Sequence, residues 1–395
     1  MLFSSCIVAL DNGVGLTPFM GWNSWNKFGC NIDEVIVRAQ VDSIVELGLH
    51  KAGYEYINID DCWMDNGRKD GYMITDKERF PSGMKALGDY IHSKGLKFGI
   101  YSSAGTLTCQ SREGSLYHEQ RDAELFAYFG VDLLKYDNCH NKMLITRSQS
   151  IKRYSAMRDA LQSQNRTVLY SLCQWGQSQP WLWADSIGNT FRSTADIGDL
   201  FKGFDLRCPC TTTRCWAFGH MCSVMNILNK QVPLTKYSKP GFFNDMDMLE
   251  VGNGGMTFAE YKSHFFLWAA LKSPLVLGLD LRTIKTKDLD LLSSKHVIAV
   301  NQDPLGKSAE LLHRTNEYDI WGGPLVDGAV AVLFNKSDKQ LSITLDLLLL
   351  NNHLKCPGKV QITDLFTELA RSVLKTYHTG PIVAHDSVIV KLVCD

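Results

Sequence analysis

Short apolar segments alternate with longer amphipathic ones between residues 19 and 281. The short segments have the length of β-strands, and the longer ones carry apolar residues at helical spacing. The strand candidates are Phe19–Trp25, Tyr54–Asp60, Lys97–Ser102, Val131–Asp137, Val168–Trp175, Thr190–Asp196, Gly241–Met248 and Pro274–Leu281. Helical segments between them include Glu34–Leu47, Glu119–Phe129, Ser148–Gln162 and Phe258–Leu271. About eight strand–helix repeats favour a closed (β/α)₈ TIM barrel, with an open sheet as the alternative, because alternation does not prove closure.

After about Gly306 the apolar residues recur at every second position. Three such runs are 330–334, 343–347 and 388–392, and turn-forming residues such as Gly322-Gly-Pro324 and Cys356-Pro-Gly358 separate the runs. A period of two with frequent turns predicts a small antiparallel β-sandwich. We therefore expect a catalytic barrel over residues 10–305 and a C-terminal sandwich over residues 306–395.

Charge and hydropathy exclude two classes of partner. The chain has 41 Lys and Arg against 42 Asp and Glu, and no basic run that would suit nucleic acid. No segment approaches the roughly 18 to 20 apolar residues of a membrane-spanning helix. With 395 residues, 45% of them hydrophobic, the chain can fill substantial cores. We expect a soluble globular protein that binds neither nucleic acid nor membrane.

Twelve cysteines are typical of an oxidising compartment rather than of the cytosol. Two glycosylation sequons, at Asn165 and Asn335, agree with that interpretation. Residues 1–9 contain an apolar segment that ends in a small residue but lack a basic start, so we interpret them as a truncated or atypical signal peptide. The sequence predicts a secreted, extracellular glycoprotein.

Carboxylates follow four of the predicted strands. In a TIM barrel the C-terminal ends of the strands surround the active site. A single Asp in that position is usually a helix cap or a turn residue. The four strand ends that carry them are Asp60-Asp61, Asp137, Asp196 and Asn244-Asp-Met-Asp-Met248. Four strand ends with the same chemistry indicate a catalytic site.

Aromatic residues occur at the same strand ends. A pyranose stacks its C–H face on an aromatic ring and offers hydroxyls to charged side chains. Each aromatic alone is more typical of core packing. The residues are Trp22, Trp25, Trp63, Tyr101 and Trp175. Aromatic rings and carboxylates together favour a sugar as the substrate.

Hydrolysis of a glycoside needs one carboxylate that attacks or activates water and a second that delivers a proton. Lys135 stands two residues before Asp137, so it can point to the same side of the strand and keep Asp137 ionised. We expect Arg192 and Asp196 to stand further apart, which leaves Asp196 able to hold a proton. The residues thus suggest Asp137 as the nucleophile and Asp196 as the acid and base.

Long motifs resemble those of glycoside hydrolase family 27, the family of α-galactosidases and α-N-acetylgalactosaminidases. The resemblance runs almost end to end and is of the fungal type. It is carried by Gly15-Leu-Thr-Pro-Phe-Met-Gly-Trp-Asn-Ser-Trp25, Ile59-Asp-Asp-Cys-Trp63, Leu134-Lys-Tyr-Asp-Asn-Cys139, Tyr170-Ser-Leu-Cys-Gln-Trp-Gly176, Arg192-Ser-Thr-Ala-Asp196 and Asn244-Asp-Met-Asp-Met-Leu249. The resemblance implies a retaining α-galactosidase, with Asp137 as nucleophile and Asp196 as acid/base.

The resemblance also implies a set of residues that bind galactose. Asp60 and Asp61 would recognise the 4- and 6-hydroxyls of galactose by hydrogen bonds. Gln174 can hydrogen-bond the 2-hydroxyl, and Trp175 fills the space that an acetamide would need, which favours galactose over N-acetylgalactosamine. The other residues around the hydroxyls or shaping the pocket are Lys135, Arg192, Asp247, Trp25, Tyr101 and Met248.

Other activities remain as alternatives. α-N-Acetylgalactosaminidase and β-L-arabinopyranosidase are enzymes on the same scaffold. A catalytically inactive lectin is disfavoured, because a lectin has no need of two opposed carboxylates. The sequence leaves the aglycone and the oligomeric state open.

The cysteine pattern of the family implies a set of disulfides. The expected pairs are Cys30–Cys62, Cys109–Cys139, Cys208–Cys222, Cys210–Cys215 and Cys356–Cys394, with Cys173 buried and free. A zinc site in the cluster at 208–222 is the rival interpretation, but the spacing is not the paired C-x₂-C of zinc ribbons. No metal or organic cofactor is expected, because the chain lacks the metal, phosphate-loop and dinucleotide motifs.

Overall fold

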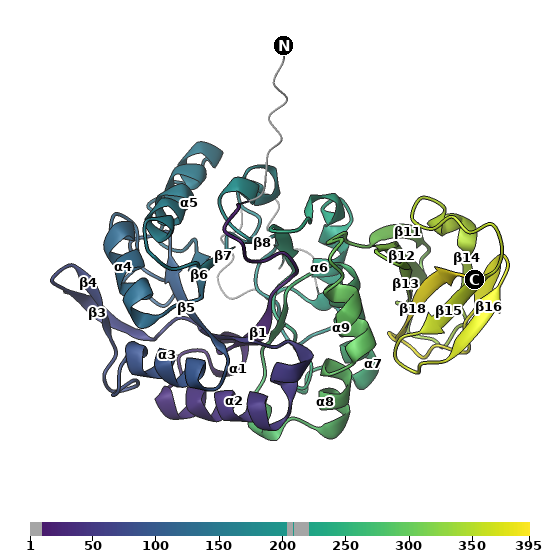
Figure 1. The fold of residues 1–395 in the computed structure, drawn as a ribbon, viewed down its shortest axis with the longest axis horizontal. Coiled ribbons are helices and arrows are strands. Elements are labelled where there is room, and N and C mark those ends of the chain that lie inside the picture. Colours follow the sequence, from purple (N-terminus) through teal and green to yellow (C-terminus); the bar gives the residue numbers. More distant parts are fainter. Residues whose placement is uncertain (1–9, 204–207, 209–220) are drawn as a thin grey trace, which may run out of the picture.

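The computed structural model describes residues 10–203, 208 and 221–395, and it contains the two predicted units (Figure 1). A barrel sheet lies within a ring of helices, and a β-sandwich lies beside α7 and α9. The barrel strands are β1 (Met20–Asn23), β2 (Tyr56–Ile59), β5 (Lys97–Ser103), β6 (Leu133–Asp137), β7 (Leu169–Leu172), β8 (Thr190–Arg192), β9 (Phe243–Asp245) and β10 (Leu275–Leu277). Each lies within a predicted strand segment or, for β5, extends one residue beyond it.

The sheet is parallel throughout and closes into a barrel. Its strand order is β10-β1-β2-β5-β6-β7-β8-β9. The two ends meet just past β9, where Leu249 N donates to Val276 O at 2.7 Å and Gly278 N donates to Leu249 O at 3.1 Å. The closed barrel is therefore confirmed over the open sheet. Closure brings all eight C-terminal strand ends to one face.

Helices cover the outside of the barrel because apolar residues at helical spacing bury one face of each against the strands. Capping boxes begin α5 at Thr146 and α7 at Thr257. The helices are α1 (Trp25–Phe28), α2 (Glu34–Glu46), α3 (Met84–Ser93), α4 (Glu119–Phe129), α5 (Arg147–Gln162), α6 (Val224–Gln231), α7 (Phe258–Ala270), α8 (Thr286–Leu292) and α9 (Lys295–Asn301). Short 3₁₀ helices are η1 (Leu49–Ala52), η2 (Pro180–Leu182), η3 (Ala184–Ser186), η5 (Thr235–Tyr237) and η6 (Leu281–Thr283).

One element of the barrel is absent from the sequence prediction. Between β2 and α3 the chain forms a hairpin of β3 (Met64–Lys69) and β4 (Tyr72–Thr75). Most of β3 is polar and exposed, so it lacks the apolar pattern that marks the barrel strands. Arg68 holds the hairpin to the barrel through a buried ion pair with Asp122 of α4, at 2.6 Å.

The C-terminal unit consists of two antiparallel sheets, as predicted. One has the order β11 (Glu310–Arg314), β12 (Tyr318–Leu325), β13 (Gly328–Asn335), β18 (Ser387–Cys394), β15 (Val360–Asp364) and β16 (Ala370–Val373). The other pairs β14 (Thr344–Asp346) with β17 (Thr376–His378), and η7 (Leu347–Leu350) follows β14.

Alternate residues of β13 pack into two different hydrophobic cores. Val332 and Phe334 belong to the core of the barrel, whereas Ala331 and Leu333 face the interior of the sandwich. Helix α7 contacts β13 and β18 across this boundary. The sandwich is thus fixed to the barrel by apolar packing on one face of its larger sheet.

Four of the expected disulfides form, and Cys173 is buried and free as predicted. The pairs are Cys30–Cys62, Cys109–Cys139, Cys208–Cys222 and Cys356–Cys394. The fifth expected pair, Cys210–Cys215, lies outside the described residues, as do residues 1–9.

The asparagines of the two sequons differ in their exposure to solvent. Asn165 is exposed and can carry a glycan. Asn335 is fully buried, and its Nδ2 donates to the carbonyl oxygens of Lys339, Ile382 and Val383. A glycan on Asn335 would remove these bonds and has no space, so the prediction of glycosylation there is wrong for the folded protein.

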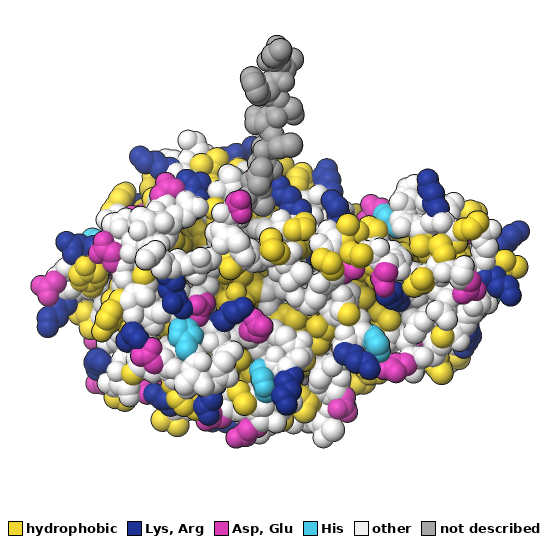
Figure 2. All heavy atoms as spheres, viewed as in Figure 1, with side chains coloured by type: hydrophobic (Ala, Val, Ile, Leu, Met, Phe, Trp, Pro, Cys, Tyr) yellow, Lys and Arg dark blue, Asp and Glu magenta, His cyan; other side chains and the backbone are white. Residues whose placement is uncertain are grey.

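The visible surface carries both signs of charge in alternation, without a patch of one sign (Figure 2). Over the described ranges, none of the helices is long and apolar enough to cross a membrane.

Candidate active site

Asp137 lies at the C-terminal end of β6 and is 6% exposed. Its Oδ2 accepts a hydrogen bond from Tyr101 Oη at 2.8 Å, and its Oδ1 accepts one from the backbone N–H of Asn138 at 2.8 Å. Burial raises the pKa of Asp137 to about 7, against the lowering influence of Lys135. The carboxyl group is therefore removed from bulk water and held by two donors.

Lys135 contacts a different carboxylate from the one we expected. Its Nζ lies 2.7 Å from Asp60 Oδ2, at the end of β2. Burial alone would lower the pKa of Lys135, but Asp60 and the other nearby carboxylates raise it above the ordinary value. Lys135 acts on Asp137 through its charge, which lowers the pKa of Asp137 in the expected direction, but burial outweighs this effect.

Asn23 also belongs to the site, although the sequence motifs did not predict a role for it. Its Nδ2 donates to Asp60 Oδ2 at 2.8 Å, and its Oδ1 accepts from the backbone N–H of Trp25 at 2.8 Å. It thereby ties the end of β1 to that of β2. Asn23 is a polar residue at the end of an otherwise apolar strand, and this pattern could have identified it.

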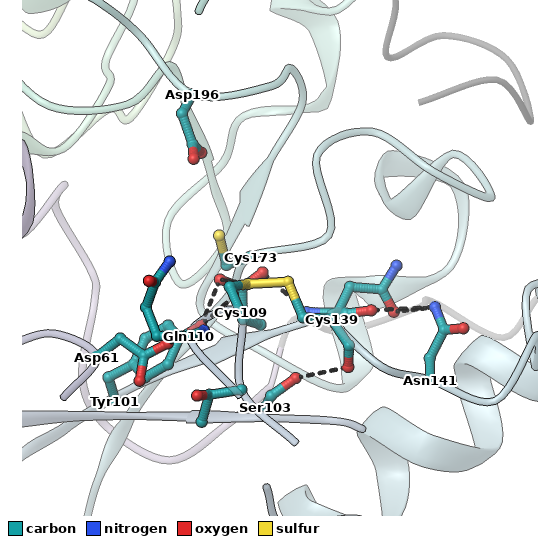
Figure 3. The surroundings of a disulfide bond; sticks show 12 residues. Asp61, Tyr101, Ser103, Cys109, Gln110, Cys139, Asn141, Cys173 and Asp196 are labelled. Atoms are coloured by element: carbon teal, nitrogen blue, oxygen red, sulfur yellow. Dashed lines mark hydrogen bonds between the residues drawn. A yellow bond between two sulfur atoms is a disulfide. The ribbon is translucent and has the colours of Figure 1, made fainter. Parts of the chain in front are cut away.

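The Cys109–Cys139 disulfide, shown in Figure 3, joins the loops after β5 and β6 and lies against the predicted nucleophile. Cys109 Sγ is 3.4 Å from Asp137 Oδ2 and 3.3 Å from Tyr101 Oη. The next residue, Gln110, donates its backbone N–H to Asp61 Oδ2 at 2.9 Å. The loop after β5 thus reaches both carboxylates, and the disulfide fixes this loop to the loop after β6.

Arg192 joins two carboxylates from its buried position at the end of β8. Its Nη2 lies 3.0 Å from Asp196 Oδ1 and 2.7 Å from Asp247 Oδ2. The expectation that Arg192 and Asp196 stand apart is therefore wrong, because the turn after β8 folds Asp196 back over the guanidinium group. The Asp196 side chain is 46% exposed, far more open than Asp137.

Asp247 has a backbone φ of +76°, a conformation that is uncommon outside glycine. Its Oδ1 accepts from the N–H of Met248 at 2.9 Å, and its Oδ2 accepts from that of Ile197 at 2.7 Å. Burial raises the pKa of Asp247 to about 6, while Arg192 acts in the opposite direction. These bonds hold the residue in its unusual conformation, next to the buried Met248.

The segment after β7 carries Cys173, Gln174 and Trp175. Cys173 Sγ lies 3.7 Å from Arg192 Nη1, at the base of the site. Gln174 is fully buried, and its Oε1 and Nε2 have no hydrogen-bond partner among the described residues. Trp175 has a φ of +53° and is partly exposed. A contact between Gln174 and a 2-hydroxyl would require this segment to shift, and it stays a prediction.

The aromatic residues fall into two groups. Trp22 and Trp63 are fully buried, and their indole N–H groups donate to Leu279 O and Tyr101 O, so they belong to the core. Trp25 and Trp175 are partly exposed and are available for stacking. Tyr101 is buried but directs its hydroxyl at Asp137.

In the described part of the chain, the cluster that most resembles a metal site consists of Cys109, Asp137 and Cys139. The two sulfur atoms are joined in a disulfide, so neither is a thiolate that could bind zinc. The cluster does not fit a metal ion.

Two carboxyl groups of different character therefore face the same space. Asp137 is buried and hydrogen-bonded, whereas Asp196 is half-exposed and held by Arg192. Figure 3 shows the Asp196 carboxyl group directed toward Cys173 and the Cys109–Cys139 disulfide. Cys109 of that disulfide lies next to Asp137. This arrangement can supply both an attacking carboxylate and a solvent-connected proton donor.

Known proteins resemble the chain over nearly its whole length. The family described as alpha galactosidase A matches residues 17–303, and the alpha galactosidase C-terminal beta sandwich domain matches residues 315–392. Alpha-galactosidase 3 of Arabidopsis thaliana is 46% identical over 340 residues, which are 85% of this chain and 72% of that protein.

Solved structures agree with the sequence relatives. Alpha-galactosidase I from Mortierella vinacea has a TM-score of 0.93 at 40% identity, with 98% of this chain and 99% of that chain covered. The Saccharomyces cerevisiae enzyme with raffinose has a TM-score of 0.90 at 33% identity, covering 96% and 98%. A β-L-arabinopyranosidase from Geobacillus stearothermophilus shares 22% identity, a level that indicates the fold alone.

Proposed function

The chain belongs to the α-galactosidase family of glycoside hydrolases, and we propose that it removes terminal α-linked galactose by double displacement, with Asp137 as the nucleophile and Asp196 as the acid/base. The substrate is a small galactoside, such as an oligosaccharide with a terminal α-linked galactose. The observation that carries the assignment of roles is the contrast between the two carboxyl groups. Asp137 is shielded from water and fixed by Tyr101, whereas Asp196 is open to solvent.

In the first step Asp137 attacks the anomeric carbon, and Asp196 donates a proton to the leaving oxygen. In the second step Asp196 takes a proton from water, which attacks the same carbon and releases galactose with its configuration retained. The nucleophile must be ionised, and the Tyr101 hydroxyl stabilises that form by donating to Asp137 Oδ2. Retention requires the two carboxyl groups to stand about 5 to 5.5 Å apart.

The remaining site residues are proposed to bind the sugar. Asp60 and Asp61 are buried and anchored by Lys135 and Gln110, so their oxygens have fixed directions for the 4- and 6-hydroxyls. Fixed acceptors discriminate between epimers, because a hydroxyl of the wrong orientation leaves a buried group unpaired. Trp25 and Met248 complete the walls of the pocket.

Asp137→Ala tests the nucleophile. We expect turnover to fall by several orders of magnitude, and azide to restore part of it by forming β-galactosyl azide. Asp132→Asn is the matched control, because Asp132 lies at the opposite end of β6 and pairs with His92 and Arg166. Near-normal turnover of the Asp137→Ala protein, or labelling of a different carboxylate by a fluorosugar, would show that the assignment is wrong.

Asp196→Ala tests the acid/base. Galactosides with poor leaving groups should lose far more kcat/KM than dinitrophenyl α-galactoside, because only the former need a proton in the first step. Equal losses on both substrates would contradict the role of Asp196.

We also propose that the protein works outside the cell, with residues 10–305 as its catalytic unit. Four disulfides join described residues, and such bonds persist in oxidising compartments. Detection of the protein and its disulfides in culture medium tests this proposal.

A further inference from the structure

The segment of residues 196–202, here called the acid/base segment, contains no helix and no strand longer than a single bridge at Ile197. At its start, Cys222 N donates to Asp196 O at 2.7 Å, and Ile197 N donates to Asp247. In its middle, Asp199 accepts from Tyr261 Oη at 2.9 Å. Further along, Val224 N donates to Leu200 O at 3.1 Å, and Met225 N donates to Phe201 O at 3.0 Å. The barrel thus holds the backbone of the segment through hydrogen bonds.

The sandwich holds the side chains at the far end of the segment. The Phe201 ring stacks on the imidazole of His385, with centroids 4.9 Å apart and planes at 26°. It also meets the edge of Phe334 in β13, at 6.0 Å between centroids. Phe201 is only 4% exposed, so this contact buries the largest side chain of the segment against the second domain.

His385 is itself tightly fixed. Its Nδ1 lies 2.8 Å from Glu260 Oε1, and its Nε2 lies 2.8 Å from Asp338 Oδ1. A carboxylate only accepts hydrogen bonds, so both contacts are hydrogen bonds when both ring nitrogens carry protons. Glu260 uses its other oxygen to cap α7 at Thr257. The imidazole is therefore clamped between a barrel helix and a loop of the sandwich.

A second contact joins the same two parts. Lys202 Nζ lies 2.7 Å from the Asp338 oxygen that His385 contacts. The acid/base segment therefore ends in a stack and an ion pair that share the His385–Asp338 unit. This unit belongs to the sandwich, which contributes none of the carboxylates at the site.

We propose that His385 is a positioning residue for Asp196, through which the sandwich fixes the acid/base segment; this inference rests on the proposed role of Asp196. Proton delivery requires the carboxyl group at a fixed distance from the leaving oxygen, and the Asp196 side chain is 46% exposed with Arg192 as its one ion-pair partner among the described residues. Its position therefore depends on how the segment is anchored at both ends.

The interface between the barrel and the sandwich does not depend on the imidazole alone. Lys262 of α7 pairs with Asp386 at 2.9 Å, and Ser263 Oγ donates to the backbone oxygen of His385 at 2.7 Å. The apolar packing of α7 on β13 and β18 also remains when the ring is removed. Loss of the imidazole should loosen the segment and leave the two domains together.

The test compares kcat/KM on melibiose, which has a poor leaving group, with kcat/KM on dinitrophenyl α-galactoside, which needs no proton. For His385→Ala we expect about a tenfold loss on melibiose and less than about a twofold loss on the aryl substrate, because general acid catalysis matters only for the former. Lys262→Met is the matched control. It breaks an interdomain ion pair without touching the acid/base segment, and it should leave the ratio of the two values unchanged.

Asp338→Ala provides a second variant at a side chain that is 81% exposed, so folding is not at risk. It removes the shared partner of His385 and Lys202, and it should lower the melibiose value selectively and to a smaller extent than His385→Ala. Unchanged ratios in the folded His385→Ala and Asp338→Ala proteins, or equal losses on both substrates, would overturn the inference.

Asp196→Ala measured in parallel separates the two claims. If Asp196→Ala shows no dependence on the leaving group, the proposed acid/base role fails. If Asp196→Ala shows that dependence and the His385 and Asp338 variants do not, only the positioning role of His385 fails.

Discussion

Tyr101 Oη donates a hydrogen bond to Asp137 Oδ2 across a distance of 2.8 Å, and both side chains are buried. The two residues come from the neighbouring strands β5 and β6. A hydroxyl that donates to a carboxylate stabilises its ionised form and so lowers its pKa. In this site that contribution opposes burial, which raises the pKa of Asp137 to about 7.

Tyr101→Phe should therefore move the acid limb of kcat/KM to higher pH. Without the hydrogen bond the pKa of Asp137 rises further, and the nucleophile becomes ionised only at higher pH, by about one unit. A pH profile of kcat/KM checks this shift. Tyr136→Phe is the control, because the buried Tyr136 hydroxyl has no partner among the described residues and should leave the limb in place. An unmoved or lowered acid limb in Tyr101→Phe would contradict the prediction.

Removal of the Cys109–Cys139 disulfide should weaken activity before the barrel unfolds. The bond fixes the loop after β5 beside Asp137, so Cys109→Ser with Cys139→Ser should lower kcat and reduce the free energy of unfolding by about 2 to 4 kcal/mol. The matched control is Cys356→Ser with Cys394→Ser in the sandwich. This double variant should have a lower free energy of unfolding but an unchanged kcat at 25 °C. Equal kcat in the two double variants would refute a role for the first disulfide in the site.

The substituent at C2 of the sugar should determine whether the enzyme prefers galactose or N-acetylgalactosamine. We expect a preference for nitrophenyl α-galactoside over its N-acetyl analogue by more than about a hundredfold in kcat/KM, roughly 3 kcal/mol, because Trp175 is large enough to fill the space that an acetamide would need. Trp175→Gly should reduce this ratio, and its φ of +53° suits glycine. A ratio near one in the natural protein would instead indicate an α-N-acetylgalactosaminidase.

Glu250 should make the protein less stable as the pH rises. Its carboxyl group is buried between the amides of Asn26 and Asn253, and burial raises its pKa to about 8. The folded pKa lies above that of the unfolded chain, so the stabilisation is complete below about pH 4.5 and is lost as the pH rises through 8. Glu250→Gln cannot ionise, and its free energy of unfolding should change less between pH 5 and pH 8. Parallel stability curves for the two proteins would show that Glu250 does not titrate in this range.

The sequence by itself determined the order of the elements and the candidate residues. Each barrel strand is apolar enough to be buried on both faces, and the polar residues at its C-terminal end interrupt that pattern, so both the strands and Asp60, Asp137, Asp196 and Asp247 could be found by inspection. The period of two after Gly306 likewise predicted the sandwich. The sequence did not predict the β3–β4 hairpin, because most of β3 is polar and exposed and carries no such signal.

Only the tertiary structure decided which charges meet. Lys135 stands two residues from Asp137 but contacts Asp60, and Arg192 contacts both Asp196 and Asp247, because closure of the barrel and the turn after β8 set these distances. The burial of Asn335 and the stack of Phe201 on His385 join segments far apart in sequence. A sequence records which groups are present, whereas the strength of an electrostatic or packing contact depends on separation in space and on exclusion of water, which the folded chain alone defines.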